Sequence, residues 1–208
     1  LSQSTEIGSI YHKRELEAIR AVCDRNRLLL YVDGARLGSA LTAASGDVTL
    51  ADMARLTDAF YIGGTKNGAL LGEALVLNNP LQQDFRFHMK QKGALLAKGR
   101  IIGLQFRELF RDNLFFDLAQ HANRMAARMR DGISAAGFKF LTDSPTNQIF
   151  PILPDTLIRR LQEHYGFYIW ARKTDTSSSI RLVTSWATPD AVVEAFLEDF
   201  AQAAAVDR

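Results

Sequence analysis

The sequence predicts an α/β protein: part of a large domain with a mixed or parallel sheet, followed by a smaller α+β domain. Two short apolar runs, 28–32 and 59–62, are each cut off by glycine or a charged residue, as is typical of buried strands. A helical pattern precedes the first run, so helix and strand alternate as in βαβ units. After Gly137 the pattern changes, and short strands and turns replace long helices.

The composition is that of an ordinary globular chain. Of its 208 residues 47% are hydrophobic and 23% charged, and the net charge is +2. A charge so close to zero argues against nucleic acid as the main partner. The single Cys23 excludes an internal disulfide and favours the reducing cytoplasm. No apolar run approaches the roughly 20 residues that span a bilayer, so no membrane partner is expected.

The chain begins at Leu1, without a methionine, in a polar stretch that is typical of the middle of a domain. A parallel sheet needs several strands to bury both faces, and two convincing candidates precede Lys66. We therefore expect an N-terminal segment that this sequence lacks. Residues 1–113 are interpreted as the C-terminal part of the large domain, and residues 114–208 as the small α+β domain.

In the first half, apolar residues recur at helical spacing before the first strand. A third apolar run is weakened by Gly72 and stopped by Asn78-Asn79-Pro80. The elements expected here are a helix at 12–26, a strand at 28–32, a helical turn at 37–41, a short helix at 47–56, and strands at 59–62 and 69–78.

In the second half, the pattern is helical from residue 81 to about residue 136, with a break at Asn113 and Gly137 as the C-cap. Antiparallel strands and two further helices are expected beyond it. They are strands at 138–141, 148–152, 167–170 and 180–184, a helix after Asp155, and a last helix that begins near residue 188.

Each of the first two strands places an ionisable residue just past its C-terminal end. Asp33 opens Asp-Gly-Ala-Arg, and Lys66 stands in Gly-Gly-Thr-Lys-Asn-Gly. Ligands bind at that edge of open α/β sheets. A pyridoxal phosphate enzyme needs this pair, because the lysine forms the Schiff base and the acid pairs with the protonated pyridine nitrogen. The alternatives are a turn or N-cap aspartate and a solvated loop lysine.

Four motifs then come in one order. They are Thr5-Glu6-x-Gly8, Asp33-Gly34-Ala35-Arg36, the turn around Lys66, and Ile180-Arg181-Leu182-Val183-Thr184. In that order they resemble the fold-type I pyridoxal phosphate enzymes, specifically the threonine aldolase and β-eliminating lyase family. The resemblance covers nearly the whole chain. It departs at Thr65-Lys66-Asn67, where members usually have Ser-Lys-Gly, and at Met89-Lys90-Gln91, where aldolases usually have Met-Arg-Gln.

The resemblance implies a role for each of six residues. Lys66 and Asp33 are the catalytic and cofactor-binding pair, and Arg181 binds the substrate α-carboxylate with a bidentate fork that lysine cannot reproduce. Further contacts to pyridoxal phosphate are implied for Arg36 (near its phenolic oxygen), Thr65 (its phosphate) and Lys90 (the phosphate of a neighbouring subunit).

Plainer interpretations stand beside these roles. Arg36 also fits a structural ion pair, and Arg181 also fits an edge-strand arginine with its head in water. The aromatic pair Tyr168 and Trp170, two residues apart, is predicted to be sheet packing. The four histidines fit no motif, and no metal site is predicted.

The implied reaction is the cleavage of a β-hydroxy-α-amino acid, such as L-threonine or L-allo-threonine, to glycine and an aldehyde. β-Elimination or transamination on the same scaffold is the first alternative, because fold does not fix function. A non-catalytic dimerisation module is an alternative of another class. The family also implies a homodimer or homotetramer, with the active site between subunits.

Overall fold

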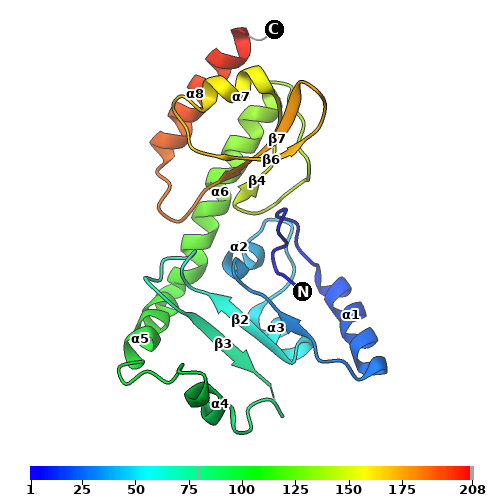
Figure 1. Cartoon of the computed structure of the whole chain (residues 1–208), viewed down its shortest axis with the longest axis vertical. Helices are drawn as coiled ribbons and strands as arrows, with labels where there is room; N and C mark the ends of the chain where they lie inside the picture. The colour runs from blue at the N-terminus through cyan, green and yellow to red at the C-terminus, as the bar shows by residue number, and fades with distance from the viewer. Residues whose placement is uncertain (79, 207–208) are drawn as a thin grey trace. The chain divides into compact units, whose positions relative to one another are not determined.

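The computed structural model describes residues 1–78 and 80–206, with residue 206 described by its backbone alone. Contacts divide the chain into two compact units (Figure 1). Unit 1 comprises residues 1–5 and 10–118, and unit 2 comprises residues 6–9 and those from Ala119 onward. The division follows Leu118, whereas the sequence predicts a boundary after Asn113. Within the described ranges, no helix has the length and apolarity to cross a bilayer.

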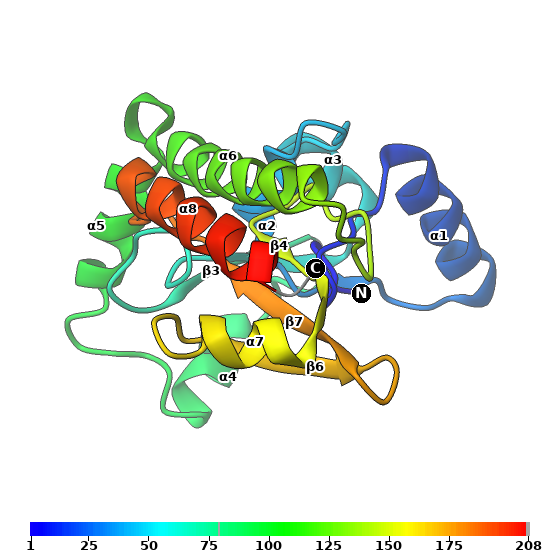
Figure 2. The ribbon, with the colours of Figure 1, turned by 90° about the horizontal axis from the view of Figure 1, so that it is seen from above.

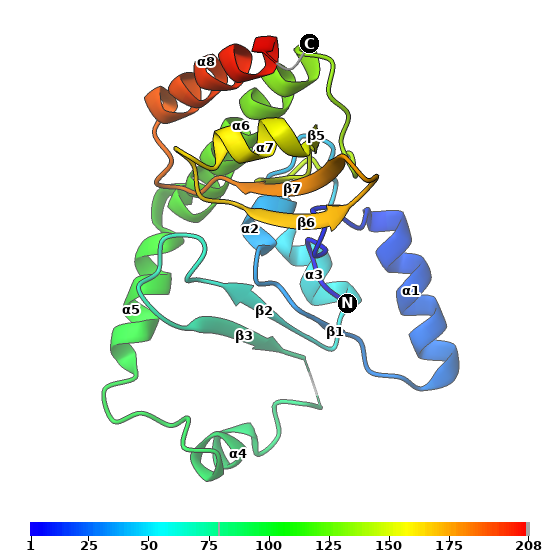
Figure 3. The ribbon, with the colours of Figure 1, turned by 45° about the horizontal axis from the view of Figure 1, so that its top comes forward.

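Unit 1 is built on a mixed sheet of three strands in the order β1-β2-β3 (Figure 3). β1 runs parallel to β2, and β3 runs antiparallel to it. The elements of unit 1 are α1 (Lys13–Asn26), β1 (Tyr31–Val32), α2 (Leu37–Leu41), α3 (Leu50–Leu56), β2 (Ala59–Gly63), β3 (Glu73–Leu77), α4 (Phe85–Gln91), α5 (Arg100–Leu109), the 3₁₀ turn η1 (Arg111–Asn113) and the first turn of α6 (Leu114–Ala135).

The core of unit 1 forms where the apolar faces of its helices meet the strands. Every helix of unit 1 except α4 contributes buried residues, and burial of that apolar area is the main force holding such a layer together. The largest fully buried side chains are Leu16 of α1, Leu37 of α2, Met53 of α3 and Phe115 of α6. The predicted alternation of helix and strand is therefore confirmed.

Two predicted strands are too long. Leu28 and Leu29 are more than half exposed, and pairing with β2 begins at Tyr31. Just before that point, the Asp58 side chain accepts the Leu30 N–H at 2.6 Å. The strand predicted at 69–78 shortens to Glu73–Leu77, because Gly72 has a φ of +85° that no regular strand adopts.

The helical region after residue 81 is also interrupted more than predicted. Residues 92–99 form no helix, and Gly93 after α4 has a φ of +70°. The predicted break at Asn113 is confirmed, because Asp112 and Asn113 both have left-handed backbones. Gly137, with a φ of +89°, follows α6 as predicted for a C-cap.

Unit 2 pairs its strands antiparallel, as predicted, with β7 at the centre. β4 and β5 lie along one edge of β7 and β6 along the other. Figure 2 shows α6 and α8 alongside each other, and both contribute to the core of this unit. The elements are the rest of α6, β4 (Gln148–Ile149), β5 (Ile152–Pro154), α7 (Asp155–Leu161), β6 (Tyr168–Arg172), β7 (Ser177–Val183) and α8 (Asp190–Val206).

The strand predicted at 148–152 is two strands, β4 and β5, because the chain is irregular at Phe150 and Pro151. Proline has no N–H to donate to a ladder. The carbonyl of Pro151 still accepts the Ile180 N–H at 3.0 Å, so both strands stay on β7. The strand predicted at 138–141 is wrong: it reduces to an isolated bridge between Phe140 and Pro151.

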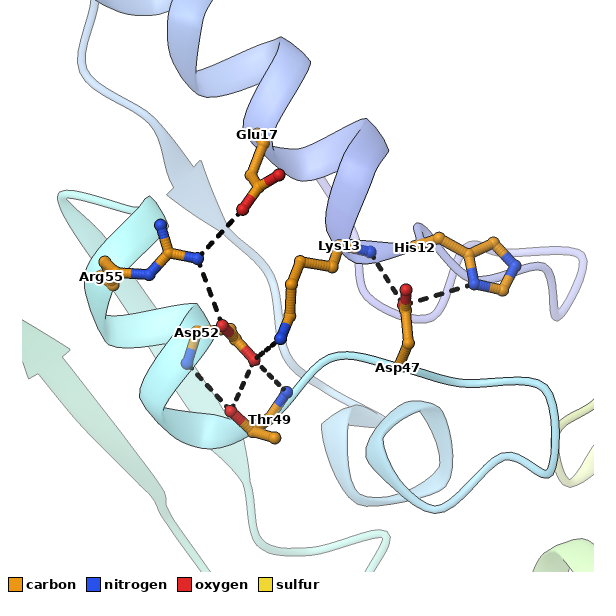
Figure 4. A network of polar contacts seen from close by, with 7 residues as sticks. All are labelled: His12, Lys13, Glu17, Asp47, Thr49, Asp52 and Arg55. Atoms are coloured by element: carbon orange, nitrogen blue, oxygen red, sulfur yellow. Dashed lines mark hydrogen bonds and ion pairs between the residues drawn. The ribbon is translucent and has the colours of Figure 1, made fainter.

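A polar network links α1 to the start of α3 (Figure 4). Thr49 is the N-cap of α3, and its hydroxyl accepts the Asp52 N–H at 3.1 Å. Asp52 binds Lys13 of α1 at 2.9 Å, and Arg55 bridges Asp52 and Glu17. The Thr49 hydroxyl, followed by the Lys13 ammonium, holds the pKa of Asp52 well below its usual range. The network fixes the entry to α3, the helix that precedes β2.

Candidate active site

The ends of β1 and β2 approach so closely that only glycines fit between them. The Gly63 N–H donates to the Gly34 carbonyl at 2.9 Å. A Cβ on Gly34 would overlap the Tyr61 carbonyl oxygen, and one on Gly63 would overlap the Ala35 carbonyl oxygen. Glycine permits such backbone contact because it has no side chain. The two loops that follow the strands are thereby held side by side.

We expect Gly34→Ala to destabilise unit 1 by about 1–3 kcal/mol, the usual cost of forcing extra volume into a packed site. The matched control is Gly103→Ala in α5, where a Cβ meets nothing within 4 Å. That change is expected to stabilise the helix by about 0.5–1 kcal/mol. Urea unfolding of both variants measures the difference, and equal midpoints would contradict the close approach of the two strands.

Asp33 lies just past β1 and is partly buried. Its Oδ1 accepts the Ala35 N–H at 2.9 Å and the Tyr61 hydroxyl at 2.5 Å. Its backbone is bound to the first residues of the chain, since the Gln3 N–H donates to the Asp33 carbonyl at 2.9 Å. The turn contact to Ala35 is the plainer role foreseen for this aspartate. It leaves Oδ2, which accepts no hydrogen bond from any described residue.

Tyr61 is the residue that the sequence reasoning missed. The register Val32↔Phe60 makes Asp33 and Tyr61 the next pair along parallel β1 and β2. No signal in the sequence indicates this pair, because register depends on the tertiary structure. Burial and the bond to Asp33 raise the pKa of Tyr61. The phenol therefore stays protonated and remains a donor to the carboxylate.

Backbone hydrogen bonds close the turn that follows β2, and Lys66 in this turn is exposed to solvent. The N–H groups of Asn67 and Ala69 donate to the Gly64 carbonyl at 2.9 and 3.0 Å. The buried Asn67 side chain donates to the Phe115 carbonyl at 2.8 Å and ties the turn to α6. Lys66 is exposed, which agrees with the plainer interpretation of a solvated loop lysine.

Lys66 and Arg36 come together at one cavity of about 10 Å³, room for about one water. Its lining comes from the two loops, from α2 and from the last residue of β2: Ala35, Arg36, Gly38, Ser39, Gly63, Lys66 and Asn67. The predicted lysine and arginine are thus neighbours on the edge where β1 and β2 end. The cavity is much smaller than an aromatic ring, so these residues do not enclose a ligand of that size by themselves.

The two residues predicted to bind phosphate do not line this cavity. Thr65 is exposed, and its hydroxyl donates to Glu73 Oε1 at 3.4 Å. Glu73 Oε2 also accepts the Gly64 N–H at 2.5 Å. A carboxylate here competes with an anionic ligand for the same donors. Lys90 is exposed on α4.

Arg181 lies in unit 2, on β7 opposite Tyr168 of β6. Its guanidinium carbon is 5.4 Å from the centre of the Tyr168 ring and 5.6 Å from that of Trp170. Trp170 packs edge-on against Phe150, with the ring centres 5.2 Å apart. The interpretation of the two aromatic residues as sheet packing is therefore incomplete, because they also hold the arginine.

The Nε atom of Arg181 is buried, and it has no hydrogen-bond partner among the residues that the structure describes. A buried donor without an acceptor is costly. An anionic ligand would supply the missing acceptor, and a carboxylate matches the planar fork of the guanidinium.

Residues 1–155 match the family model of the beta-eliminating lyases. The chain belongs to the beta-eliminating lyase family. The mixed sheet of unit 1, and the likeness of the whole chain to solved pyridoxal phosphate enzymes of fold type I, confirm the predicted fold class. Enzymes of the family use pyridoxal phosphate as their cofactor.

Several known proteins are similar to this lyase-family chain over almost all of its length. It is 30% identical over 191 residues to the low specificity L-threonine aldolase of Pseudomonas aeruginosa, covering 90% of this chain and 54% of the relative. The solved threonine aldolase of Leishmania major is 46% identical with a TM-score of 0.95. The match covers 98% of this chain and 60% of the Leishmania chain. Serine palmitoyltransferase from Sphingomonas wittichii, 17% identical with a TM-score of 0.69, shares the fold alone.

The lyase-family chain thus spans a little more than half the length of the relatives it matches. Within that span the residues fit the cofactor of the family. Asp33 has a carboxylate oxygen that no described residue uses, and Lys66 presents an exposed amine at the neighbouring strand end.

Proposed function

We propose that this chain is part of a pyridoxal phosphate-dependent lyase that cleaves β-hydroxy-α-amino acids, such as L-threonine and L-allo-threonine, to glycine and an aldehyde. One observation carries the proposal: the Asp33 carboxylate and the Lys66 amine follow neighbouring parallel strands that end at the same edge. The names and similarity of the aldolases from Pseudomonas and Leishmania support the substrate class.

Within this proposal, Lys66, Asp33 and Arg36 hold the cofactor. Pyridoxal phosphate, when bound, supplies an aldehyde that condenses with amines and a ring that accepts the electrons of a broken bond. Asp33 provides a negative charge for the ring nitrogen and thereby favours its protonated form. Lys66 provides the amine that attaches the cofactor.

Arg181 binds the α-carboxylate of the substrate in the same proposal. Its guanidinium already rests against two aromatic rings, so little conformational freedom is lost when a carboxylate binds. A bidentate pair also fixes orientation, which selects the bond at the α-carbon that breaks.

We also propose a cytoplasmic homo-oligomer, a dimer or tetramer. In that assembly Thr65 and Lys90 act as phosphate-binding residues, with Lys90 reaching a neighbouring subunit. Sedimentation of the holoenzyme tests the assembly, and a monomer at working concentration would contradict it.

The proposed reaction is tested by incubating the holoenzyme with L-threonine and L-allo-threonine and assaying glycine and acetaldehyde. Equal amounts of the two products are expected. Pyruvate and ammonia from serine, with no glycine, would indicate β-elimination instead. A protein that neither binds pyridoxal phosphate nor releases any of these products would indicate the non-catalytic dimerisation module.

Arg181→Lys is expected to raise the KM for L-threonine by about tenfold or more with a smaller effect on kcat, because lysine keeps the charge but loses the fork. The matched control is Arg159→Lys, an exposed position on α7, for which KM should not change. Steady-state kinetics of both variants measure the ratio. An unchanged KM in Arg181→Lys would exclude Arg181 as the carboxylate ligand.

A further inference from the structure

We propose that Tyr61 is a positioning residue of the active site, whose phenol holds Oδ1 of Asp33 so that Oδ2 remains for the protonated ring nitrogen of the cofactor. The inference rests on the proposed function and adds a residue that acts through Asp33. It is carried by the contacts around this carboxylate.

The first step is the strength of the contact. The Tyr61 hydroxyl lies 2.5 Å from Asp33 Oδ1, within the range of charge-assisted O–H···O⁻ bonds, which are stronger than bonds between neutral groups. Burial raises the pKa of Tyr61, and the neighbouring carboxylate raises it further. The phenol therefore donates throughout the pH range in which enzymes work.

The second step is the direction that the contacts impose. Oδ1 accepts two donors from different elements, the Ala35 N–H of its own loop and the hydroxyl of Tyr61 on β2. Two donors from separate elements fix the plane of the carboxylate. Both use the same oxygen, so Oδ2 is the acceptor that remains for a ligand.

The third step is the charge. Both donors are neutral, and no cation of the described chain forms an ion pair with Asp33. A partly buried carboxylate without a cationic partner is unfavourable. Tyr61 orients this carboxylate without neutralising it, which leaves the full charge for a cation on the ligand. A protonated ring nitrogen has that chemistry.

Tyr31 provides a matched control. Its ring centre is 6.4 Å from that of Tyr61, and it lies on the neighbouring strand β1. It is 49% exposed, and within the described chain its hydroxyl makes no hydrogen bond to Asp33. Tyr31→Phe and Tyr61→Phe thus each remove one hydroxyl from the same neighbourhood, and Tyr61→Phe alone removes a donor to Asp33.

The experiment measures the dissociation constant of pyridoxal phosphate by titrating the resolved apoenzyme and following cofactor absorbance. Tyr61→Phe is expected to weaken binding about tenfold, the effect of one hydrogen bond to a charged group. Tyr31→Phe should change the dissociation constant by less than about twofold. In an Asp33→Asn background, Tyr61→Phe should raise the dissociation constant by less than about a further twofold, because the effects of residues that act through one another are not additive.

Three results would overturn the inference. Equal dissociation constants for Tyr61→Phe and Tyr31→Phe would show that the Tyr61 hydroxyl has no role in cofactor binding. A full tenfold loss in the Asp33→Asn background would show that Tyr61 does not act through Asp33. A wild-type protein that binds no pyridoxal phosphate would overturn the proposed function, and this inference with it. Cofactor binding without cleavage of L-threonine would contradict the proposed substrate alone, since this measurement uses no substrate.

Discussion

A Lys66→Ala holoenzyme is expected to lose the borohydride-reducible absorbance of covalently attached pyridoxal phosphate, and its cleavage activity is expected to fall by several orders of magnitude. The amine of Lys66 is the proposed attachment point at the end of β2, and alanine cannot form that bond. Because Lys66 is exposed, the variant should fold normally. Absorbance before and after reduction, with thermal unfolding, measures both effects.

The matched control is Lys139→Ala, an exposed lysine of unit 2, which should keep both the absorbance and the activity. Mass spectrometry of the reduced wild-type protein should place the modified peptide at Lys66. Reducible absorbance that persists in Lys66→Ala would assign the attachment to another lysine.

Asp33→Asn is expected to lower kcat by about 10²–10³-fold, the usual effect of removing one preorganised electrostatic group from a catalytic site. Asparagine has the same shape, and its carbonyl oxygen can still accept hydrogen bonds from Ala35 and Tyr61. The change therefore removes charge while the local geometry remains. Loss of that charge acts most on the step in which the ring accepts electrons, so kcat should fall more than KM rises.

Asp24→Asn provides the control, because that aspartate is exposed on α1 and should leave kcat unchanged. The kinetics of both variants are measured with L-threonine at saturating cofactor. Wild-type kcat in Asp33→Asn would mean that this carboxylate is only the turn aspartate that bonds the Ala35 N–H.

Much of the secondary structure could be predicted because local patterns determine it. The helix at 12–26 has a clear apolar face, and α1 covers Lys13–Asn26. Strand ends were less predictable, since a strand exists only where a partner pairs with it. The apolar side chains of Leu28 and Leu29 predict a strand, but both residues precede the segment that pairs with β2. In the sequence, Gly72 weakens the third apolar run. Only the structure shows its left-handed backbone, which keeps residues 69–72 out of the strand.

The candidate site divides in the same way. The positions of Asp33 and Lys66 after two strands could be predicted, because the carboxyl ends of parallel strands share an edge. The partners of these residues could not. The pairing of β1 with β2 places Tyr61 beside Asp33, and the pairing of β6 with β7 places Tyr168 and Trp170 beside Arg181. The predicted roles of all six site residues remain predictions.

By itself the sequence determined the chemistry available to this lyase-family chain: an aspartate and a lysine after successive strands, and an arginine in a strand of the second unit. Spacing along the chain sets those positions, and they can be read without coordinates. The tertiary structure alone decided that the Asp33 carboxylate is held through one oxygen and that Lys66 is exposed. Hydrogen-bond partners and solvent exposure depend on residues distant in sequence, so they exist only once the sheet has formed.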